Sequence, residues 1–383
     1  MVYKNVEIFI DEKTKIEKGF ILVEDGLIKK VKSMKEYDLN YEKTGVKDFN
    51  GYKIYPGFID SHSHIGMWET GLNFAGDDGN EETNPITPHF RAIDAANPKD
   101  DAFFKALKAG ITTVVTGPGS SNPIGGSFVA LKTYGDCVDD MVIKNPVGIK
   151  FALGENPKTA YNKKEMTPTT RMGTAALIRE ELEKAKRYWL KQKKGEQQSF
   201  NFKSEALIPL LEGKIKAFFH CHRADDIFTA IRIAKEFNLN FSLVHATEGY
   251  LFKEYLKNVD VILGPFISDI SKPELKNFSE KSAYVLNNAN VTFSICTDHP
   301  VFPIEYLNLA CIVAIKNGLS KEQAVLAITK NAAITAGIYD LTGSIEVNKM
   351  ANFVVFKKDE EIFSPYVEPS FVIIDGKIAF EKF

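Results

Sequence analysis

The stretch Pro56-Gly57-Phe58-Ile59-Asp60-Ser61-His62-Ser63-His64 reads as a buried strand that ends in two histidines. Side chains alternate between the two faces of a strand. The alternation predicts one set of residues on the face that carries both imidazoles: Phe58, Asp60, His62 and His64. Ile59 and Ser61 are then expected on the opposite face. A His-x-His pair alone is a weak indication of a metal site, so its meaning depends on the rest of the chain.

Size and composition limit what this chain can be. With 383 residues, 44% of them apolar, it can bury a large core, as two domains or as one barrel with an annex. The formal net charge of −2 gives no basic excess for nucleic acid or for an anionic membrane surface. We find no apolar run of membrane-spanning length and no signal-peptide pattern, and therefore expect a soluble cytoplasmic protein. The cysteines show no Cys-x-x-Cys spacing and are expected to be buried apolar residues: Cys137, Cys221, Cys296 and Cys311.

Both ends of the chain read as short strands joined by turns. The step Asp25-Gly26 lies between two apolar runs, which is typical of a hairpin. The same pattern of short strands and turns returns only after residue 343. We therefore predict one small antiparallel β unit built from residues 1–55 and 341–383, flanking a domain of residues 56–340.

In the middle of the chain, strand-like and helix-like segments alternate, as they do in a parallel sheet or barrel with crossover helices. Further strands are expected at residues 111–115, 127–131, 147–153, 215–222, 241–245, 259–263 and 291–298, which brings their number to eight. Helices are expected at residues 174–191, 224–237, 304–316 and 321–336. Residues 156–203 read as an insertion on the C-terminal side of the barrel.

Histidines recur where the predicted strands end. His220 and His222 share one face of their strand, and His245 is the last residue of the next. In residues 291–298 the small polar residues share a face with Asp298, which is expected to point inward at the mouth of the barrel. Five of the seven histidines thus end strands, which is where enzymes of this architecture have their sites.

These residue types suit a divalent metal. Zinc takes imidazole nitrogen and carboxylate oxygen, and a catalytic ion keeps one position for water. Two close ions also need an anionic bridge. Lys150 is predicted to face inward, where it could capture carbon dioxide as an anionic carbamate, and Glu155 at the mouth could bridge directly instead. Strand alternation favours Lys150 slightly as the bridging ligand, and both Lys150 and Glu155 remain candidates.

The pattern resembles the amidohydrolase superfamily over nearly the whole chain. The resemblance rests on residues 56–64, His220, His245, Thr297-Asp298, and the closing segments 343–347 and 351–355. Residues 123–126, 150–156 and 222–226 look most like the imidazolonepropionase-related branch. It implies an α/β fold, a distorted TIM (β/α)8 barrel flanked by a small β-sandwich, with a mono- or binuclear metal centre that hydrolyses C–N bonds.

Carried over residue by residue, the resemblance gives a ligand set and leaves the substrate open. The positions that match metal ligands are His62, His64, His220, His245 and Asp298. The lysine of the carboxylated members falls on Lys150. His222 has no firm counterpart and is a candidate for supporting the ligands or binding substrate. The insertion and the glycine-rich run at residues 117–126 differ from imidazolonepropionase, so its substrate is not transferred.

The expected activity is hydrolysis of an amide-like bond in a small molecule, such as a dipeptide or an N-acyl amino acid. One or two metal ions per chain are expected, zinc first, with a metal-bound hydroxide attacking and Asp298 as general base. Candidates for holding a substrate carboxylate are Arg171, Arg223, Gly125 and Gly126. The alternatives are a ring deaminase, a cyclic-amide hydrolase, or a non-enzymatic barrel used for binding. Self-association stays open.

Overall fold

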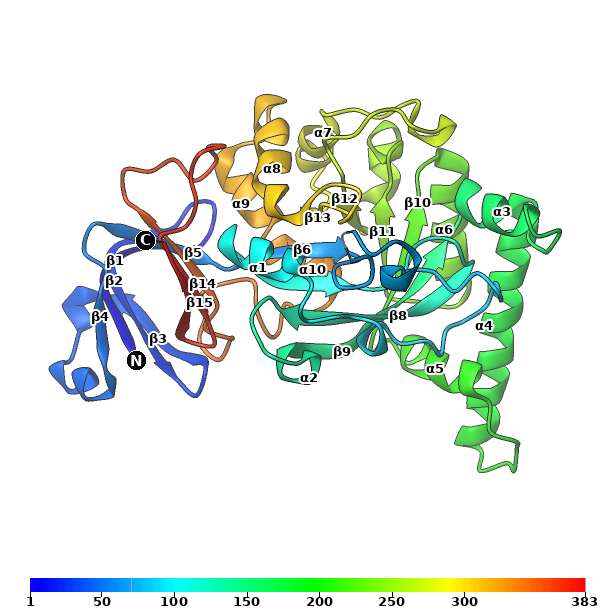
Figure 1. Ribbon diagram of the computed structural model, residues 1–383, viewed down its shortest axis with the longest axis horizontal. Coiled ribbons are helices and arrows are strands. Elements are labelled where there is room, and N and C mark those ends of the chain that lie inside the picture. The colour runs from blue at the N-terminus through cyan, green and yellow to red at the C-terminus, as the bar shows by residue number, and fades with distance from the viewer. Residues whose placement is uncertain (70, 383) are drawn as a thin grey trace.

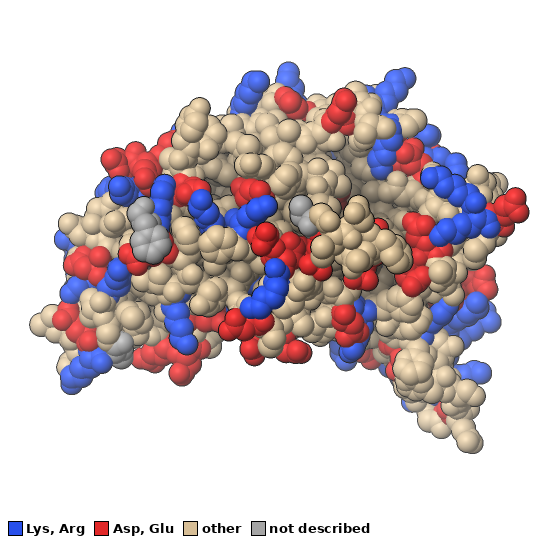
Figure 2. Space-filling model, in the orientation of Figure 1, with Lys and Arg blue, Asp and Glu red and all other residues tan. Residues whose placement is uncertain are grey.

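The computed structural model describes residues 1–69 and 71–382 and contains two sheets, each with its own hydrophobic core. Figure 1 shows the first sheet on the left, where both chain ends lie, and the second sheet on the right, surrounded by helices. Within the described residues, no helix is long and apolar enough to cross a membrane. Figure 2 shows acidic and basic side chains interspersed over the visible face, with no broad patch of one sign.

The first sheet combines strands from both ends of the chain. Its order is β16-β15-β14-β5-β1-β2-β3, and β4 also pairs with β1. The strands are β1 (Val2–Phe9), β2 (Lys15–Glu24), β3 (Leu27–Ser33), β4 (Val46–Asp48), β5 (Tyr52–Pro56), β14 (Phe353–Lys357), β15 (Phe371–Ile374) and β16 (Lys377–Glu381). The predicted turn between β2 and β3 is present, with positive φ angles at Asp25 and Gly26. The predicted β unit made from two distant pieces of chain is confirmed.

The second sheet forms the barrel, in the order β13-β12-β11-β10-β9-β8-β7-β6. Its strands are β6 (Phe58–Ser63), β7 (Ile111–Thr116), β8 (Ile124–Lys132), β9 (Val142–Ala152), β10 (Lys216–Cys221), β11 (Phe241–His245), β12 (Asp260–Leu263) and β13 (Phe293–Ile295). The ring is nearly closed by backbone hydrogen bonds from Asp298 N to His62 O (3.2 Å) and from His64 N to His299 O (2.8 Å). The eight-stranded barrel is therefore confirmed, in a distorted form.

One strand breaks the expected alternation of strand and helix. β8 runs antiparallel to both β7 and β9, because the glycine-rich segment after β7 turns directly back without a crossover helix. Consequently β8 begins at the mouth of the barrel, whereas its neighbours end there. A strictly parallel arrangement is thus wrong at this strand.

The helices surround the barrel and close its base. They are α1 (Asp101–Lys108), α2 (Val138–Met141), α3 (Glu155–Asn162), α4 (Arg171–Lys193), α5 (Phe202–Leu211), α6 (Ala224–Glu236), α7 (Ser282–Asn288), α8 (Leu307–Lys316), α9 (Lys321–Ala327) and α10 (Lys330–Ala336). The expected helix at residues 321–336 is two helices. Ala332, Ala333 and Ala336 of α10 pack into the interior core of the barrel. The predicted insertion is wrong for α4, since Ile178 and Leu182 belong to the main core under the helices.

The alternation of β6 also differs from the prediction. Ile59 lies in the interior core of the barrel, and Phe58 lies in the core between strands and helices. The pairing with β7 is irregular between Asp60 and Ser63, and Asp60 Oδ1 accepts a hydrogen bond from His62 N (3.2 Å). This irregularity brings His62 to the inner side although Asp60 is not on it.

Candidate metal centre

Asp298 joins the histidines that end separate strands. Its carboxylate lies 3.5 Å from His62 Nε2 and 3.3 Å from His64 Nε2, both from the end of β6. Its other oxygen lies 3.9 Å from Nε2 of His245, the last residue of β11. The four side chains come from three parts of the barrel and meet at its C-terminal mouth, as predicted.

Two groups of possible metal ligands overlap in this place. One group is His62, His245 and Asp298, and the other is His220, His222 and His245. Within each group the ligand atoms lie within 4.8 Å of one another. The sequence left the role of His222 open, and the structure places it beside His220 and His245. Because His245 belongs to both groups, they form one continuous centre.

Hydrogen bonds to one ring nitrogen orient three of the imidazoles. Nδ1 of His64 lies 2.6 Å from Gly117 O, and Nδ1 of His245 lies 2.7 Å from Gly264 O. Nδ1 of His222 lies 2.7 Å from Thr247 Oγ1. In each ring, the partner at Nδ1 leaves Nε2 as the nitrogen that can bind a metal.

Two further imidazoles carry a buried nitrogen without a partner among the described residues. These are Nδ1 of His62 and Nδ1 of His220. Burial lowers the pKa of both rings well below the ordinary value, and it lowers the pKa of His245 to about 4. Neutral imidazoles at physiological pH are the form that binds metals.

The backbone is strained at the centre. Three residues that are not glycine have positive φ angles there: His245 (69°), Ala246 (42°) and Asp298 (55°). Such conformations cost free energy and are found preferentially at functional sites. The pKa of Asp298 is lowered, because His245, His64 and Lys150 outweigh the effect of burial.

Lys150 lies at the floor of the centre. Its side chain is fully buried, and Nζ lies 3.4 Å from His62 Nε2. Burial lowers the pKa of this ammonium to about 8. No ion pair joins it to a carboxylate within the described ranges, so it neither reaches solvent nor pairs with Glu155. Gly125 allows β8 to approach, since a Cβ there would lie 3.3 Å from Cβ of Lys150.

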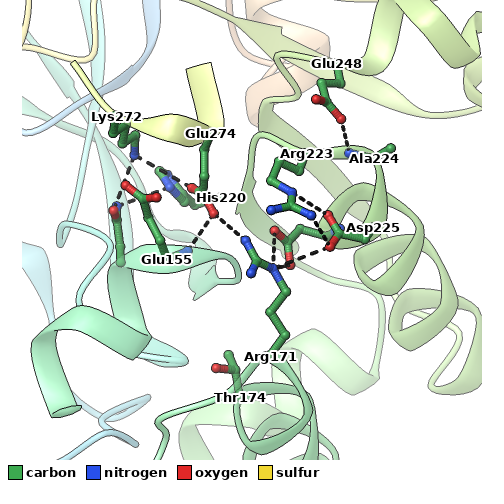
Figure 3. Close-up of polar contacts among 12 residues, drawn as sticks. Glu155, Arg171, Thr174, His220, Arg223, Ala224, Asp225, Glu248, Lys272 and Glu274 are labelled. Atoms are coloured by element: carbon green, nitrogen blue, oxygen red, sulfur yellow. Dashed lines mark hydrogen bonds and ion pairs between the residues drawn. The ribbon is translucent and has the colours of Figure 1, made fainter. Parts of the chain in front are cut away.

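Glu155, the other predicted bridging residue, lies farther out. It begins α3, and its backbone N–H donates to Glu274 Oε1 (2.7 Å). Figure 3 shows it beside Lys272 and Glu274, and it does not line the cavity over the histidines. The structure therefore brings Lys150, rather than Glu155, into contact with a predicted ligand.

Asp60 is a buried carboxylate next to the centre to which the sequence analysis gave no role in the site. Asp60 is fully buried and accepts hydrogen bonds from the hydroxyl and the backbone N–H of Thr297. Burial raises the pKa of Asp60 to about 7. Because Thr297 precedes Asp298 and Asp60 precedes His62 by two residues, this pair fixes β6 against the segment that carries Asp298.

The centre opens into a cavity of about 690 Å³. His64, His220, His222, His245 and Asp298 form its polar floor. Trp68, Leu275 and Phe278 contribute an apolar wall. Asn156 and Lys272 also line it, and Asn156 Nδ2 lies 3.2 Å from His220 Nε2. Asn156 lies in the first turn of α3, and Lys272 lies in the segment after β12. Neither residue ends a predicted strand, so the sequence pattern did not identify them.

The two arginines predicted to bind a substrate carboxylate lie elsewhere. The Arg171 guanidinium donates to Asp226 (3.1 Å) and Glu274 (2.9 Å), and Arg223 donates to Asp225 (3.0 Å) (Figure 3). Neither arginine lines the cavity. Both are occupied by carboxylates of the protein itself, so their geometry does not favour the predicted role.

The glycine-rich segment has packing reasons for its glycines. A Cβ at Gly126 would lie 2.4 Å from the backbone oxygen of Phe90. Gly125 and Gly126 line a neighbouring cavity of about 290 Å³, not the one over the histidines.

The prediction for the cysteines holds for three of them, whereas Cys137 is exposed.

Comparison with known proteins gives a consistent family. A model of the amidohydrolase family matches residues 54–379. The sequence is 27% identical over 394 residues to "Amidohydrolase tasK" of Hapsidospora irregularis. The match covers 95% of this chain, and the chain spans 40% of the length of that curated relative.

Solved structures agree with this match. An amidohydrolase from Thermotoga maritima MSB8 is 37% identical, with a TM-score of 0.92 and full coverage of both chains. A Xaa-Pro dipeptidase with bound methionine is 16% identical, with a TM-score of 0.57 over 100% of this chain and 99% of its own. The second likeness shows a shared fold only.

Proposed function

The chain belongs to the amidohydrolase family, and on that premise we propose that it hydrolyses an amide-like C–N bond of a small molecule with the help of divalent metal. The observation that supports this proposal most is the pair of overlapping ligand groups that share His245 at the floor of the cavity. An enzyme of this architecture has its site at this end of the barrel.

The residues present fit a metal such as zinc. Their donor atoms are imidazole nitrogens and a carboxylate oxygen, and burial lowers the pKa of His62 and His220 so that these two imidazoles are neutral. The residues that would hold one or two ions are His62, His64, His220, His245 and Asp298, with His222 close enough to join them. When bound, a divalent ion there supplies Lewis acidity, which polarises a carbonyl and lowers the pKa of water.

Lys150 is proposed as the anionic bridge for a second ion. Its amine would form a bond to the carbon of carbon dioxide and release a proton, which gives a carbamate. The support is geometric: the amine is fully buried beside His62 and no carboxylate pairs with it. A carbamate would exchange a costly buried cation for an anion among neutral imidazoles.

Asp298 is proposed to move the proton. Its side chain is 13% exposed and lines the cavity, so it can reach both a water molecule and a substrate nitrogen. It would take a proton from the attacking water and return it to the leaving nitrogen. His222, held through Nδ1 by Thr247, faces the same space and would orient the substrate or assist in holding metal.

The test is Asp298→Asn, which keeps the size of the side chain and removes its basicity. Turnover is measured with a panel of N-acyl amino acids, dipeptides, cyclic amides and amino-substituted rings. We expect the variant to retain metal and to lose about 10²- to 10⁴-fold in kcat. Near-normal turnover would remove Asp298 from this role. Release of ammonia from rings, without cleavage of open-chain amides, would favour ring deamination instead.

A further inference from the structure

One cation lines the cavity over the histidines. Among the residues that the structure describes there, Lys272 is the only lysine or arginine. It directly precedes the short helix η6 (Pro273–Leu275), in the segment that follows β12 and covers the mouth. Its side chain is 23% exposed, so the ammonium is near the entrance and is not sequestered in the core.

The ammonium is held next to the histidine centre by a short chain of contacts. Lys272 Nζ lies 3.3 Å from Asn156 Oδ1, and Asn156 Nδ2 lies 3.2 Å from His220 Nε2 (Figure 3). One amide side chain therefore separates the ammonium from His220, which limits their separation to about 9 Å. This is the scale of a small amide substrate.

The described residues leave N–H donors of Lys272 without a hydrogen-bond acceptor. Among the described residues, the carboxylate oxygen paired with Lys272 is Glu274 Oε2, at 4.0 Å, which is too long for a hydrogen bond. The hydrogen bonds that Glu274 accepts from Arg171 (2.9 Å) and from the backbone N–H of Glu155 (2.7 Å) both go to Oε1, and Oε2 has no hydrogen-bond partner among the described residues. An ammonium has three N–H donors, and Asn156 is the one hydrogen-bond acceptor that the described residues give it.

We propose that Lys272 binds the carboxylate of the substrate, and that this enzyme acts on N-acyl amino acids or dipeptides whose carboxylate lies on the amine side of the scissile bond. This inference rests on the proposed amide hydrolysis and names its substrate class. In such a molecule the carboxylate carbon is three bonds from the scissile carbonyl carbon, about 3.8 Å in the extended form. A carbonyl over the histidines thus brings its carboxylate within reach of Lys272.

The rest of the cavity fits the same class. Trp68, Leu275 and Phe278 offer an apolar surface for the side chain of an amino acid. The carboxylates of Glu69 and Asp269 also line the cavity, but no ion pair between either of them and Lys272 is found in residues 1–69 and 71–382. Asn156 acts as a positioning residue that holds the ammonium at the mouth.

The test compares an acid with its neutral counterpart. N-acetyl-L-leucine and N-acetyl-L-leucinamide are titrated calorimetrically into the purified protein, or into its Asp298→Asn variant if either compound is cleaved. We expect the acid to bind about tenfold more tightly than the amide, as for a charged hydrogen bond. In Lys272→Met the preference is expected to vanish. Lys276→Met, an exposed lysine outside this cavity, is expected to keep it.

The outcomes separate the two proposals. Equal binding of acid and amide by the unmodified protein overturns the role of Lys272, as does a preference that survives in Lys272→Met. Failure of the acid to saturate the protein in the millimolar range also overturns it. Loss of stability in Lys272→Met with an unchanged preference would show a structural lysine. If the preference depends on Lys272 but no amide is cleaved, the proposed hydrolysis fails while the carboxylate site stands.

Discussion

Arg171 is expected to stabilise the fold rather than to bind substrate, and Arg171→Ala tests this. Its guanidinium joins the start of α4 to Asp226 of α6 and to Glu274 before α7. The two carboxylate side chains are only 3% and 2% exposed. Removal of the arginine leaves both of them buried without their main partner, which typically costs about 3–5 kcal/mol. Because Arg171 itself is 29% exposed and water can enter, we expect about 3 kcal/mol.

The same helix offers a matched control. Arg179 of α4 makes two hydrogen bonds to Glu236 of α6, at 2.6 and 2.9 Å, but this carboxylate is 38% exposed. Arg179→Ala is therefore expected to cost only about 0–1 kcal/mol. Both variants are compared by urea unfolding, followed by far-ultraviolet circular dichroism. Equal losses of unfolding free energy in the two variants would refute the reasoning.

The loss in Arg171→Ala is also expected to depend on pH. Burial raises the pKa of Asp226, and the charge of Arg171 opposes that effect. Without Arg171 the pKa of this carboxyl rises further in the folded state. A raised folded-state pKa means that the protonated form favours folding at low pH and that this contribution is lost as pH rises. The deficit of the variant should therefore be smaller near pH 4 than at pH 7.

Three further substitutions are expected to have defined effects. Gly126→Ala places a Cβ 2.4 Å from the backbone oxygen of Phe90 and should cost about 1–3 kcal/mol in thermal or urea unfolding. Gly173→Ala in α4, where the nearest atom is 3.4 Å away, should instead add about 0.5 kcal/mol; a similar loss in both would contradict the packing argument. Lys150→Met should leave the fold intact and lower the metal bound per chain, measured by elemental analysis. Unchanged metal in that variant would exclude a bridging role.

Sequence alone predicted the inner residues of three barrel strands. In β9, β10 and β13 the apolar residues on alternate positions pack under the helices. That packing leaves Lys150, His220 and Asp298 on the other face, as expected. The prediction works because the outer face of such a strand is buried under helices and carries apolar side chains. Since side chains alternate between the two faces, these apolar residues recur at every second position of the sequence.

The departures come from contacts that no local pattern encodes. In β6 the carboxylate of Asp60 binds the backbone of His62, and this irregularity shifts the alternation. The antiparallel direction of β8 depends on the turn after β7, and the sequence of this turn does not differ from that of other glycine-rich loops. Arg171 was chosen on charge alone, whereas its partners Asp226 and Glu274 lie far along the chain. Long-range pairing of charges cannot be read from a single sequence.

The metal content of the chain tests the central claim most directly. Protein purified without added metal is examined by elemental analysis, and its intact mass is measured under native conditions. We expect close to two divalent ions per chain and additional mass equal to one carbon dioxide, as a carbamate on Lys150 requires. One ion without added mass would leave a mononuclear centre and remove the bridge. A chain that binds no divalent metal, even when zinc is supplied, would contradict the account.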